Sequence, residues 1–340
     1  MSIELGEIVA QAVDLDASDI YLTVGQPVFF RIHGKMEPWA GGKCSEEDMS
    51  TCIEGMLGRE QQERLREDRE MDFSWESHGR RFRGNAYFQR GWMAVVLRLL
   101  SDRIFSFGEI GVERALNRLL AARDGLILVT GTVGTGKSTT IASYIEAVNQ
   151  SRPAHVITLE DPLEYVYKPK KCFISQRELG RDFLSFPRGL RSALREMPDI
   201  ILVGELRDAE TMRTALMAGE TGILVLGTLH TKSAAETAMR VEGMFPANQR
   251  EVIREQFAAV FTGILSQQLV PSEKGGRVCA AEVLLATTAA RNIIRQGKYP
   301  QLNSVMMSGR ELGMQTRQMA LKELHRRGLI TGESMERFAV

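Results

Sequence analysis

The sequence predicts an α/β protein with two domains, a small N-terminal α+β domain and a larger domain built on a parallel sheet. From residue 125 to about residue 230, short apolar stretches alternate with helical stretches. This is typical of a parallel sheet that is covered on both faces. The first hundred residues instead show the pattern of hairpins and short helices, and 340 residues are enough for two domains.

The N-terminal domain is expected over residues 1–100. Ser45 should cap its first surface helix, because Asp48 follows three residues later. In the stretch 80–89, Phe82, Ala86 and Phe88 should face one way; the other face should carry Arg81, Arg83, Asn85 and Tyr87. The elements expected are strands at 18–24, 27–34, 72–76, 80–89 and 92–100 and helices at 45–57 and 58–70.

The second domain is expected over residues 113–340, after a linker at 101–112. It should begin with a helix at 113–123 and become mostly helical from about residue 234. Its expected strands are 125–131, 155–161, 199–205 and 222–230, with one more at 278–286 inside the helical part.

Composition excludes several classes of protein. Lys and Arg together number 43, as do Asp and Glu, so no global basic field draws the chain to nucleic acid. The four cysteines form no Cys-x-x-Cys pair, which argues against a zinc site or a disulfide framework. The N-terminal residues lack the basic region of a secretory signal. No apolar stretch reaches the roughly 18 residues that span a bilayer, so we expect a cytoplasmic protein.

The stretch GTVGTGKST, residues 131–139, matches the phosphate-binding pattern G-x-x-x-x-G-K-[ST] between a predicted strand and a predicted helix. Lys137 would supply a charge to the β- and γ-phosphates, and Ser138 a hydroxyl to Mg²⁺. The helix that follows would direct its positive end at the anion. ATP and Mg²⁺ are therefore the expected cofactors, with these nucleotide-binding residues: Gly131, Thr132, Val133, Gly134, Thr135, Gly136, Lys137, Ser138 and Thr139.

Carboxylates follow at the carboxyl ends of the next strands, where ligands bind in such sheets. A carboxylate at this edge can orient the attacking water or support the metal. It can also cap a helix or pair with Arg207 or Arg188, and these alternatives stay open. The candidates are Glu160, Asp161, Glu164 and Glu205.

His230 ends a fourth strand at the same edge of the sheet. A histidine there can bond the γ-phosphate, although lone histidines are more often structural. The position favours a functional role.

Six blocks in order along nearly the whole chain resemble the secretion ATPase superfamily of type II secretion and type IV pilus systems. Within it, the PilT-type retraction ATPases are the most similar. The blocks correspond to that family's opening segment, arginine-bearing strand, Walker A box, Asp box, Walker B region and His box. They are residues 17–34, 81–90, 131–139, 157–165, 185–208 and 220–231.

The resemblance implies a PAS-like N-terminal domain and a RecA-like P-loop ATPase domain. It implies a homohexameric ring with ATP between neighbouring subunits. The implied partners are an inner-membrane platform protein and the rest of the pilus machinery, met at the cytoplasmic face of the membrane.

Site residues carried over from the resemblance include Lys137 and Ser138 for phosphate and Mg²⁺. Glu164 and Glu205 become the candidates for water activation and metal support, without a decision on which is the base. Arg83 and Arg98 become candidate arginine fingers, because a permanently charged guanidinium suits transition-state phosphate. The alternative for both arginines is a solvated strand face.

Two features favour a retraction motor over an assembly motor. Assembly ATPases usually carry a tetracysteine zinc module after Walker B, where this chain has only Cys279, and a long extra N-terminal domain for which 340 residues leave no room. The stretch AARNIIRQGK, residues 289–298, resembles a coupling motif of the retraction family, with Ala290 and Gln296 as departures. On a helix it would carry a basic stripe formed by Arg291, Arg295 and Lys298, and the motif residues are Arg291, Asn292, Ile294 and Arg295.

Two departures leave a narrower assignment open. Ile223 stands where the His box usually begins with histidine, and Met197 replaces an expected acid. An accessory PilU-like paralogue or a short secretion-system ATPase is therefore an alternative. Outside this class, a RecA-like nucleic-acid translocase is disfavoured by the zero net charge, and an adaptor that binds ATP without turnover is disfavoured by the number of acids beside the phosphate loop.

Overall fold

The structure is a computed structural model that describes residues 4–100 and 103–339. It divides into two compact units. One comprises the described residues up to Arg103 together with Pro162–Val166, and the other comprises Ile104–Asp161 and the residues from Tyr167 onward. The first two residues of the expected linker, 101–102, lie outside the described residues, and the domain boundaries given above stay a prediction.

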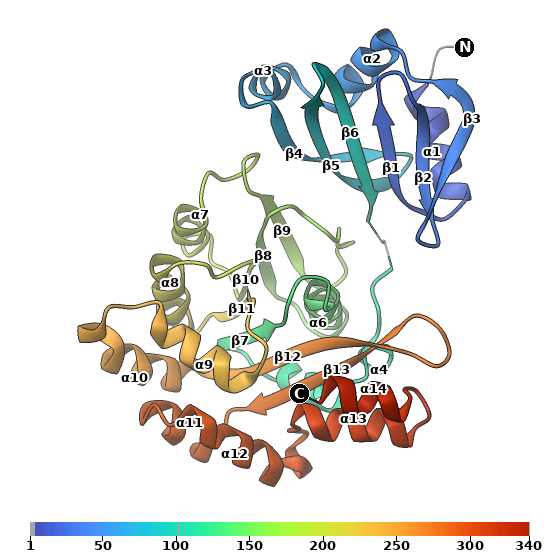
Figure 1. Ribbon diagram of the computed structural model, residues 1–340. Helices are drawn as coiled ribbons and strands as arrows, with labels where there is room; N and C mark the ends of the chain where they lie inside the picture. The colour runs from blue at the N-terminus through green and yellow to red at the C-terminus, as the bar shows by residue number, and fades with distance from the viewer. Residues whose placement is uncertain (1–3, 101–102, 340) are drawn as a thin grey trace. The chain divides into compact units, whose positions relative to one another are not determined.

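The N-terminal unit is a six-stranded antiparallel sheet in the order β3-β2-β1-β6-β5-β4 (Figure 1). All the strands and helices expected from the sequence are present, and the structure adds α1 and β3. Ser45 and Asp48 form the predicted capping box at the start of α2. The elements are α1 (Leu5–Asp14), β1 (Ala17–Thr23), β2 (Pro27–Ile32), β3 (Lys35–Lys43), α2 (Glu46–Met56), α3 (Arg59–Asp68), β4 (Glu70–Ser77), β5 (Arg80–Gln89) and β6 (Trp92–Leu99).

One face of this sheet forms the core of the unit. Phe82 and Ala86 on β5 are fully buried there, and Phe88 packs against the same cluster, as the alternation in the sequence predicts. Apolar residues of α1, α2 and α3 complete that core. The other face carries Arg83, which lies directly opposite Arg98 in the β5–β6 register.

The second unit is a seven-stranded sheet in the order β13-β12-β7-β11-β10-β8-β9. All neighbouring strands are parallel except β12 and β13. Every residue of β7, β10 and β11 is buried, because helices cover both faces (Figure 1). The strands are β7 (Gly125–Thr130), β8 (His155–Glu160), β9 (Phe173–Glu178), β10 (Ile200–Val203), β11 (Leu224–Leu229), β12 (Phe261–Pro271) and β13 (Arg277–Leu285).

The helices of this unit connect the parallel strands and form its C-terminal part. The α-helices are α4 (Phe107–Ile110), α5 (Glu113–Leu120), α6 (Lys137–Ser151), α7 (Phe186–Ala193), α8 (Ala209–Glu220), α9 (Ala234–Gly243), α10 (Arg250–Val260), α11 (Thr288–Arg295), α12 (Leu302–Ser308), α13 (Arg317–Arg326) and α14 (Gly332–Phe338). Three short 3₁₀ helices accompany them: η1 (Ala247–Gln249), η2 (Tyr299–Gln301) and η3 (Arg310–Leu312).

The structure corrects three expectations for this unit. The part after residue 234 is mostly helical, as expected, but it contains a second strand that was not predicted, the 11-residue β12, which pairs with β7. The edge strand β9 was not predicted, and its side chains are mostly only half-buried. The helix α4 lies inside the stretch expected to be a linker.

Candidate nucleotide-binding site

The phosphate loop connects the buried strand β7 to the 15-residue helix α6. Gly131, Gly134 and Gly136 all have positive φ, at 145°, 76° and 86°. Gly136 is the N-cap of α6, and the first bond of the helix runs from Thr140 N to Gly136 O at 3.0 Å. The positive end of α6 therefore opens directly into the loop, which is the arrangement that favours phosphate.

Gly131 is restricted by space as well as by its backbone angle. A Cβ built on it would lie 2.5 Å from Gln267 O and 2.5 Å from Thr135 Oγ1. At Gly134 and Gly136 a Cβ would meet nothing within 4 Å, so there the positive φ alone favours glycine. The first glycine thus lets the loop leave β7 in close contact with β12.

Gln267 is a residue of this site that the sequence reasoning missed. It is 2% exposed, and its Nε2 donates to Thr140 Oγ1 on the first turns of α6 at 2.7 Å. Its backbone oxygen forms the wall beside Gly131. The available signal was a run of polar residues, Ser266 to Gln268, inside an apolar stretch.

Lys137 folds back over the loop. Its Nζ donates to Gly131 O at 2.9 Å and to Thr132 O at 3.0 Å. Thr135 Oγ1 donates to Thr132 O at 2.9 Å and closes the loop on itself. Val133 stands at the tip, 86% exposed. Ser138 and Thr139 are half-buried in the first turn of α6.

Glu205 lies just past the carboxyl end of β10 and makes two polar contacts at the expected edge. Its Oε2 lies 2.7 Å from Nη2 of Arg207, and its Oε1 lies 3.4 Å from Nε2 of His230. Burial raises the pKa of the Glu205 carboxyl, but the hydrogen bond and charge of Arg207, with the charge of His230, outweigh burial and lower that pKa below its ordinary value. Glu205 is therefore an ionised carboxylate next to His230, as the sequence suggested, and Arg207 is its pairing partner.

The ends of β8 and β10 are drawn together by Gly204. Its N–H donates to Leu159 O at 2.7 Å, and a Cβ on it would lie 3.0 Å from the same oxygen. Glu160 therefore ends β8 near Glu205. Asp161 follows Glu160 and is exposed, and its negative charge contributes to raising the pKa of Arg207. Glu164 differs from these acids, because it lies in the segment Pro162–Val166 that groups with the N-terminal unit.

Comparisons with known proteins identify the family of the chain. The chain matches the family described as type II/IV secretion system protein over residues 2–330. It belongs to this family. It is 41% identical over 332 residues to the type IV pilus retraction ATPase PilT of Pseudomonas aeruginosa, covering 97% of this chain and 96% of that protein. It is 35% identical over 332 residues to the PilU ATPase of the same organism, covering 97% and 87%.

A solved structure of the pilus retraction motor PilT with bound ADP has a TM-score of 0.92 and 43% identity, covering 98% of this chain and 96% of that one. The ATPase DotB of Legionella pneumophila has a TM-score of 0.84 and 27% identity, covering 97% and 93%. The chain is thus an ATPase of the type II/IV secretion family, and the predicted α/β fold is confirmed.

The family's arginine-bearing strand is β5 of the N-terminal unit. Arg83 is half-exposed and lies 4.0 Å from Asp72, while Arg98 Nε donates to Asp19 Oδ1 at 2.9 Å. Asp19 is only 4% exposed and also lies 3.4 Å from Arg31. Both candidate arginine fingers are exposed, Arg83 by 46% and Arg98 by 68% of the side chain, and each pairs with a carboxylate on the sheet face opposite the core, so the solvated strand face stays an alternative for both.

The predicted basic stripe at 289–298 is wrong in part. Helix α11 ends at Arg295, so Lys298 lies beyond it, after Gly297 with a φ of 65°. The two arginines of the helix are bonded to α10. Nη1 of Arg291 donates to the backbone oxygens of Ala258, at 2.8 Å, and of Ala259.

Arg295 extends the same attachment. Its Nε donates to Glu255 Oε2 on α10 at 3.1 Å, and its Nη1 to Asn292 Oδ1 at 3.1 Å. Ile294 is fully buried beneath it. The helix α11 is thus fixed to the C-terminal half of α10.

Both departures from the family pattern lie at the other edge of the sheet. Ile223 precedes β11 and Met197 precedes β10, whereas Glu205 and His230 follow those strands. The six-residue β11 spans about 20 Å and the four-residue β10 about 13 Å. Met197 also has a φ of 54° and is 86% exposed.

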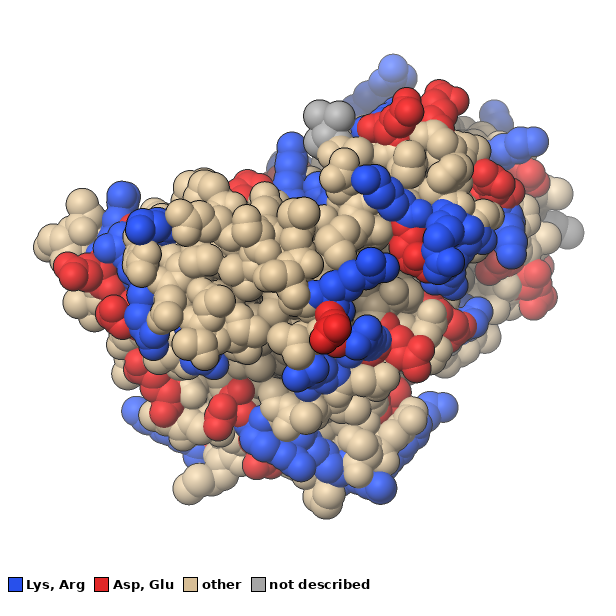
Figure 2. All heavy atoms as spheres, turned by 90° about the horizontal axis from the view of Figure 1, so that it is seen from below, with Lys and Arg blue, Asp and Glu red and all other residues tan. Residues whose placement is uncertain are grey.

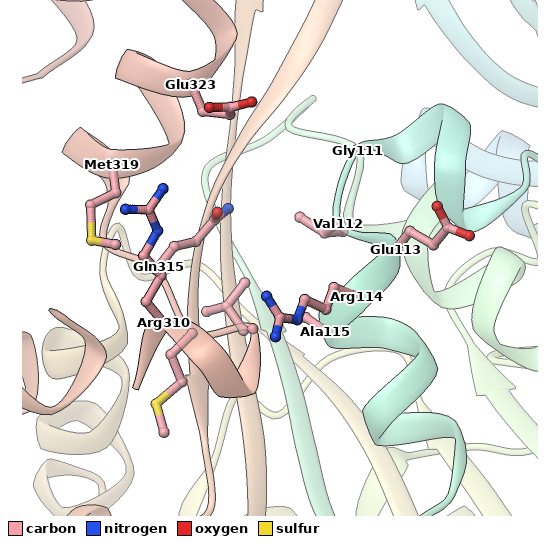
Figure 3. Close-up of a pocket in the computed structure, with 12 residues that line it drawn as sticks. Gly111, Val112, Glu113, Arg114, Ala115, Arg310, Gln315, Met319 and Glu323 are labelled. Carbon is pink, nitrogen blue, oxygen red and sulfur yellow. The ribbon is translucent and has the colours of Figure 1, made fainter. Parts of the chain in front are cut away.

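A cavity of about 180 Å³ lies apart from the phosphate loop (Figure 3). Arg114 on α5, Arg310 on η3 and Gln315 line it, together with Glu113 and Glu323. It contains none of the residues of the nucleotide site. Its rim carries charges of both signs.

The parts of the chain that the structure describes contain no cluster of three or more His, Cys, Asp or Glu side chains able to hold a metal ion. Within residues 4–100 and 103–339, no helix has the length and apolarity to cross a membrane.

Replacing Gly131 by alanine should abolish nucleotide binding or reduce the affinity by at least tenfold. The new Cβ must displace Gln267 O or Thr135, and the φ of 145° is strained for alanine. Titration with a fluorescent ADP analogue measures the effect. Gly243→Ala is the control, because a Cβ there meets nothing within 4 Å. Equal affinity in the two variants would contradict the close packing.

Replacing Arg207 by alanine should move the acid limb of the pH profile of ATP hydrolysis to higher pH. Arg207 lowers the pKa of Glu205 and burial raises it, so without Arg207 the carboxyl protonates at a higher pH. Steady-state kcat measured from pH 4.5 to 8 tests this. Arg191→Ala, which removes the exposed Arg191–Glu210 pair, should leave the limb in place. If the acid limb of Arg207→Ala stays at the wild-type pH or moves to lower pH, the role of Arg207 is refuted.

Proposed function

We propose that this chain hydrolyses ATP at the carboxyl edge of its parallel sheet and uses the energy to retract type IV pili. The observation that carries the proposal is the arrangement of one sheet edge. The phosphate loop leaves β7 there, and the paired Glu205 and His230 leave β10 and the neighbouring β11. Similarity to PilT over nearly the full length of both chains supports retraction as the work performed.

The phosphates would lie against the loop and the positive end of α6. Lys137 already reaches back over the loop, and its Nζ would move a short distance from carbonyl oxygens to phosphate oxygens. Mg²⁺ bound to ATP would be held by the Ser138 hydroxyl and would neutralise phosphate charge. Glu205 is a weaker candidate as a metal ligand, because one of its oxygens pairs with Arg207 and the other lies 3.4 Å from Nε2 of His230.

Glu205 is our candidate for orienting the attacking water. It is ionised, and His230 contacts one of its oxygens. It follows β10, which pairs with β11, and β11 pairs with the phosphate-loop strand β7. His230 would then bond the γ-phosphate as that water attacks. Glu164 remains the second candidate for the base, and Glu160 would support the same edge.

The assembly we propose is a homohexameric ring with ATP between neighbouring subunits. Arg83 and Arg98 would act as arginine fingers from the N-terminal unit, where their guanidinium groups are held by Asp72 and Asp19. The partner would be an inner-membrane platform protein, approached from the cytoplasm, and through it the rest of the pilus machinery. Nucleic acid is not an expected partner, and the face in Figure 2 shows acidic and basic side chains interspersed rather than a basic field.

Lys137→Ala in the native host should leave cells with excess surface pili and no surface motility, because pili would still be assembled and no longer withdrawn. Purified Lys137→Ala should show no ATP hydrolysis. Pili are counted by electron microscopy beside a motility assay. Cells without pili would identify an assembly motor, and unchanged piliation would identify an accessory motor like PilU or a motor of another secretion system.

Helix α11 would couple nucleotide state to the pilus machinery. Its arginines hold it to α10, and α10 runs without a loop into β12, which pairs with the phosphate-loop strand. A shift of the loop can therefore reach α11 through bonded elements.

Arg291→Ala should retain ATP hydrolysis within a fewfold of wild type and lose retraction, because α11 would lose its bonds to the end of α10. Hydrolysis and surface pili are measured on the same variant. Arg326→Ala is the control, since its side chain is 76% exposed and its ion pair joins residues of one helix. Parallel loss of hydrolysis and motility in Arg291→Ala would show that the anchor is only structural.

A further inference from the structure

Three buried threonine hydroxyls meet between the phosphate loop and the His230 segment. Thr237 Oγ1, on α9, lies 2.7 Å from Thr231 Oγ1 and 3.3 Å from Thr130 Oγ1. Thr130 and Thr237 are fully buried, and Thr231 is 5% exposed. The predicted site residues did not include any of the three.

The direction of each hydrogen bond follows from counting protons. Thr237 Oγ1 lies 2.7 Å from Ser233 O, a carbonyl oxygen that can only accept, so the single hydroxyl proton of Thr237 is used there. Thr130 and Thr231 must therefore donate to the lone pairs of Thr237. The Thr237 hydroxyl therefore donates one hydrogen bond, to Ser233 O, and accepts two, from Thr130 and Thr231.

These three hydroxyls, the hydroxyl node, join the residues that flank the phosphate loop and His230. Thr130 is the last residue of β7 and precedes Gly131, and Thr231 follows His230. Gly131 N also donates to Leu229 O, at 3.3 Å. The hydroxyl node thus fixes how far the start of the phosphate loop lies from the residue after His230.

The far side of the node is held firmly. Ala234 N, at the start of α9, donates to Glu282 Oε2 on β13 at 2.8 Å, and Arg317 donates to Lys232 O. Glu282 is 7% exposed. The turn between His230 and α9 is therefore fastened to β13 and α13, and Thr237 has a rigid support from which to act.

We propose that Thr237 is a positioning residue for ATP hydrolysis, which sets His230 relative to the phosphate loop through Thr231 and Thr130. The proposal rests on the function proposed above, because it assigns Thr237 to the same site. Thr237 touches no reacting atom. It acts by holding the ends of β7 and β11, which lead to the phosphate loop and to His230.

Three variants of the full chain test this inference. Thr237→Val keeps the shape of the side chain and removes the hydroxyl, and Thr237→Ser keeps the hydroxyl. Thr214→Val is the matched control, because Thr214 is also a buried helical threonine, 9% exposed, that donates to a backbone oxygen four residues earlier, Glu210 O, at 2.9 Å. Thr214 Oγ1 bonds within its own helix α8, so Thr214→Val removes that intrahelical bond.

We expect Thr237→Val to lower kcat about tenfold with KM for ATP within about twofold, the size of effect that loss of a positioning contact produces. Thr237→Ser should recover most of the rate, and Thr214→Val should keep it. Thermal unfolding should shift further in Thr237→Val than in Thr214→Val, because the buried hydroxyls of Thr130 and Thr231 also lose their acceptor. A rate in Thr237→Val equal to that of Thr214→Val, or a rate in Thr237→Ser as low as in Thr237→Val, would overturn the proposal.

Amide hydrogen exchange gives a readout that needs no turnover. Thr237→Val should speed exchange in both residues 131–136 and residues 228–233, whereas Thr214→Val should change neither. Faster exchange confined to α9 would mean that the hydroxyl only stabilises its own helix. If wild-type protein does not hydrolyse ATP, the proposed function fails, and the exchange result alone still decides whether Thr237 positions the two segments.

Discussion

The parallel pairing of β7 with β11 on one side and β12 on the other is the constraint on which the rest of the site depends. Thr130 lies opposite Leu229 in one register and Ser266 in the other, so the phosphate loop must leave the sheet between two neighbouring strands. A side chain at Gly131 has no room there, because Gln267 O closes the space. The positive φ of that glycine and the direction of α6 follow from the same crowding, since the chain must turn sharply to begin a helix at Lys137.

The charges at the sheet edge follow from this placement. Glu205 stands just past the end of β10, the strand next to β11, and its partial burial there favours the protonated carboxyl. Arg207, two residues along the chain, lowers the pKa of Glu205 and so reverses that tendency. His230, after β11, lowers the same pKa further. The proposed role of Glu205 in orienting water requires an ionised carboxylate at neutral pH, and the pairing with Arg207 is compatible with that requirement.

The elements that could be predicted from the sequence are those whose own residues show a clear local pattern, such as an apolar run or a glycine spacing. The strands β7, β10 and β11 are apolar throughout because both faces are covered, and the phosphate loop follows from the glycine spacing. The strand β12 could not be found this way. Its Ser266, Gln267 and Gln268 are polar, and Gln267 is buried only because Thr140, 127 residues away, accepts its bond. In the same way, the spacing of Arg291 and Arg295 indicated a helix face but not that α10 covers it. Partners distant in sequence supply what the local pattern lacks.

The junction of α10 and β12 provides the continuous backbone that the proposed coupling between the sheet edge and α11 requires. Val260 ends the helix and Phe261 begins the strand, so no flexible loop separates them. From Phe261 the strand runs about 20 Å to Gln267 at the phosphate loop, while Arg291 holds the last carbonyls of α10 just before the junction. A loop would absorb a displacement by changing its backbone angles, whereas a helix bonded directly to a strand within a close-packed sheet must move with it or break hydrogen bonds. The distance between α11 and the nucleotide site is therefore spanned by hydrogen-bonded backbone, and the departures at Ile223 and Met197 lie outside this path, at the opposite ends of β11 and β10.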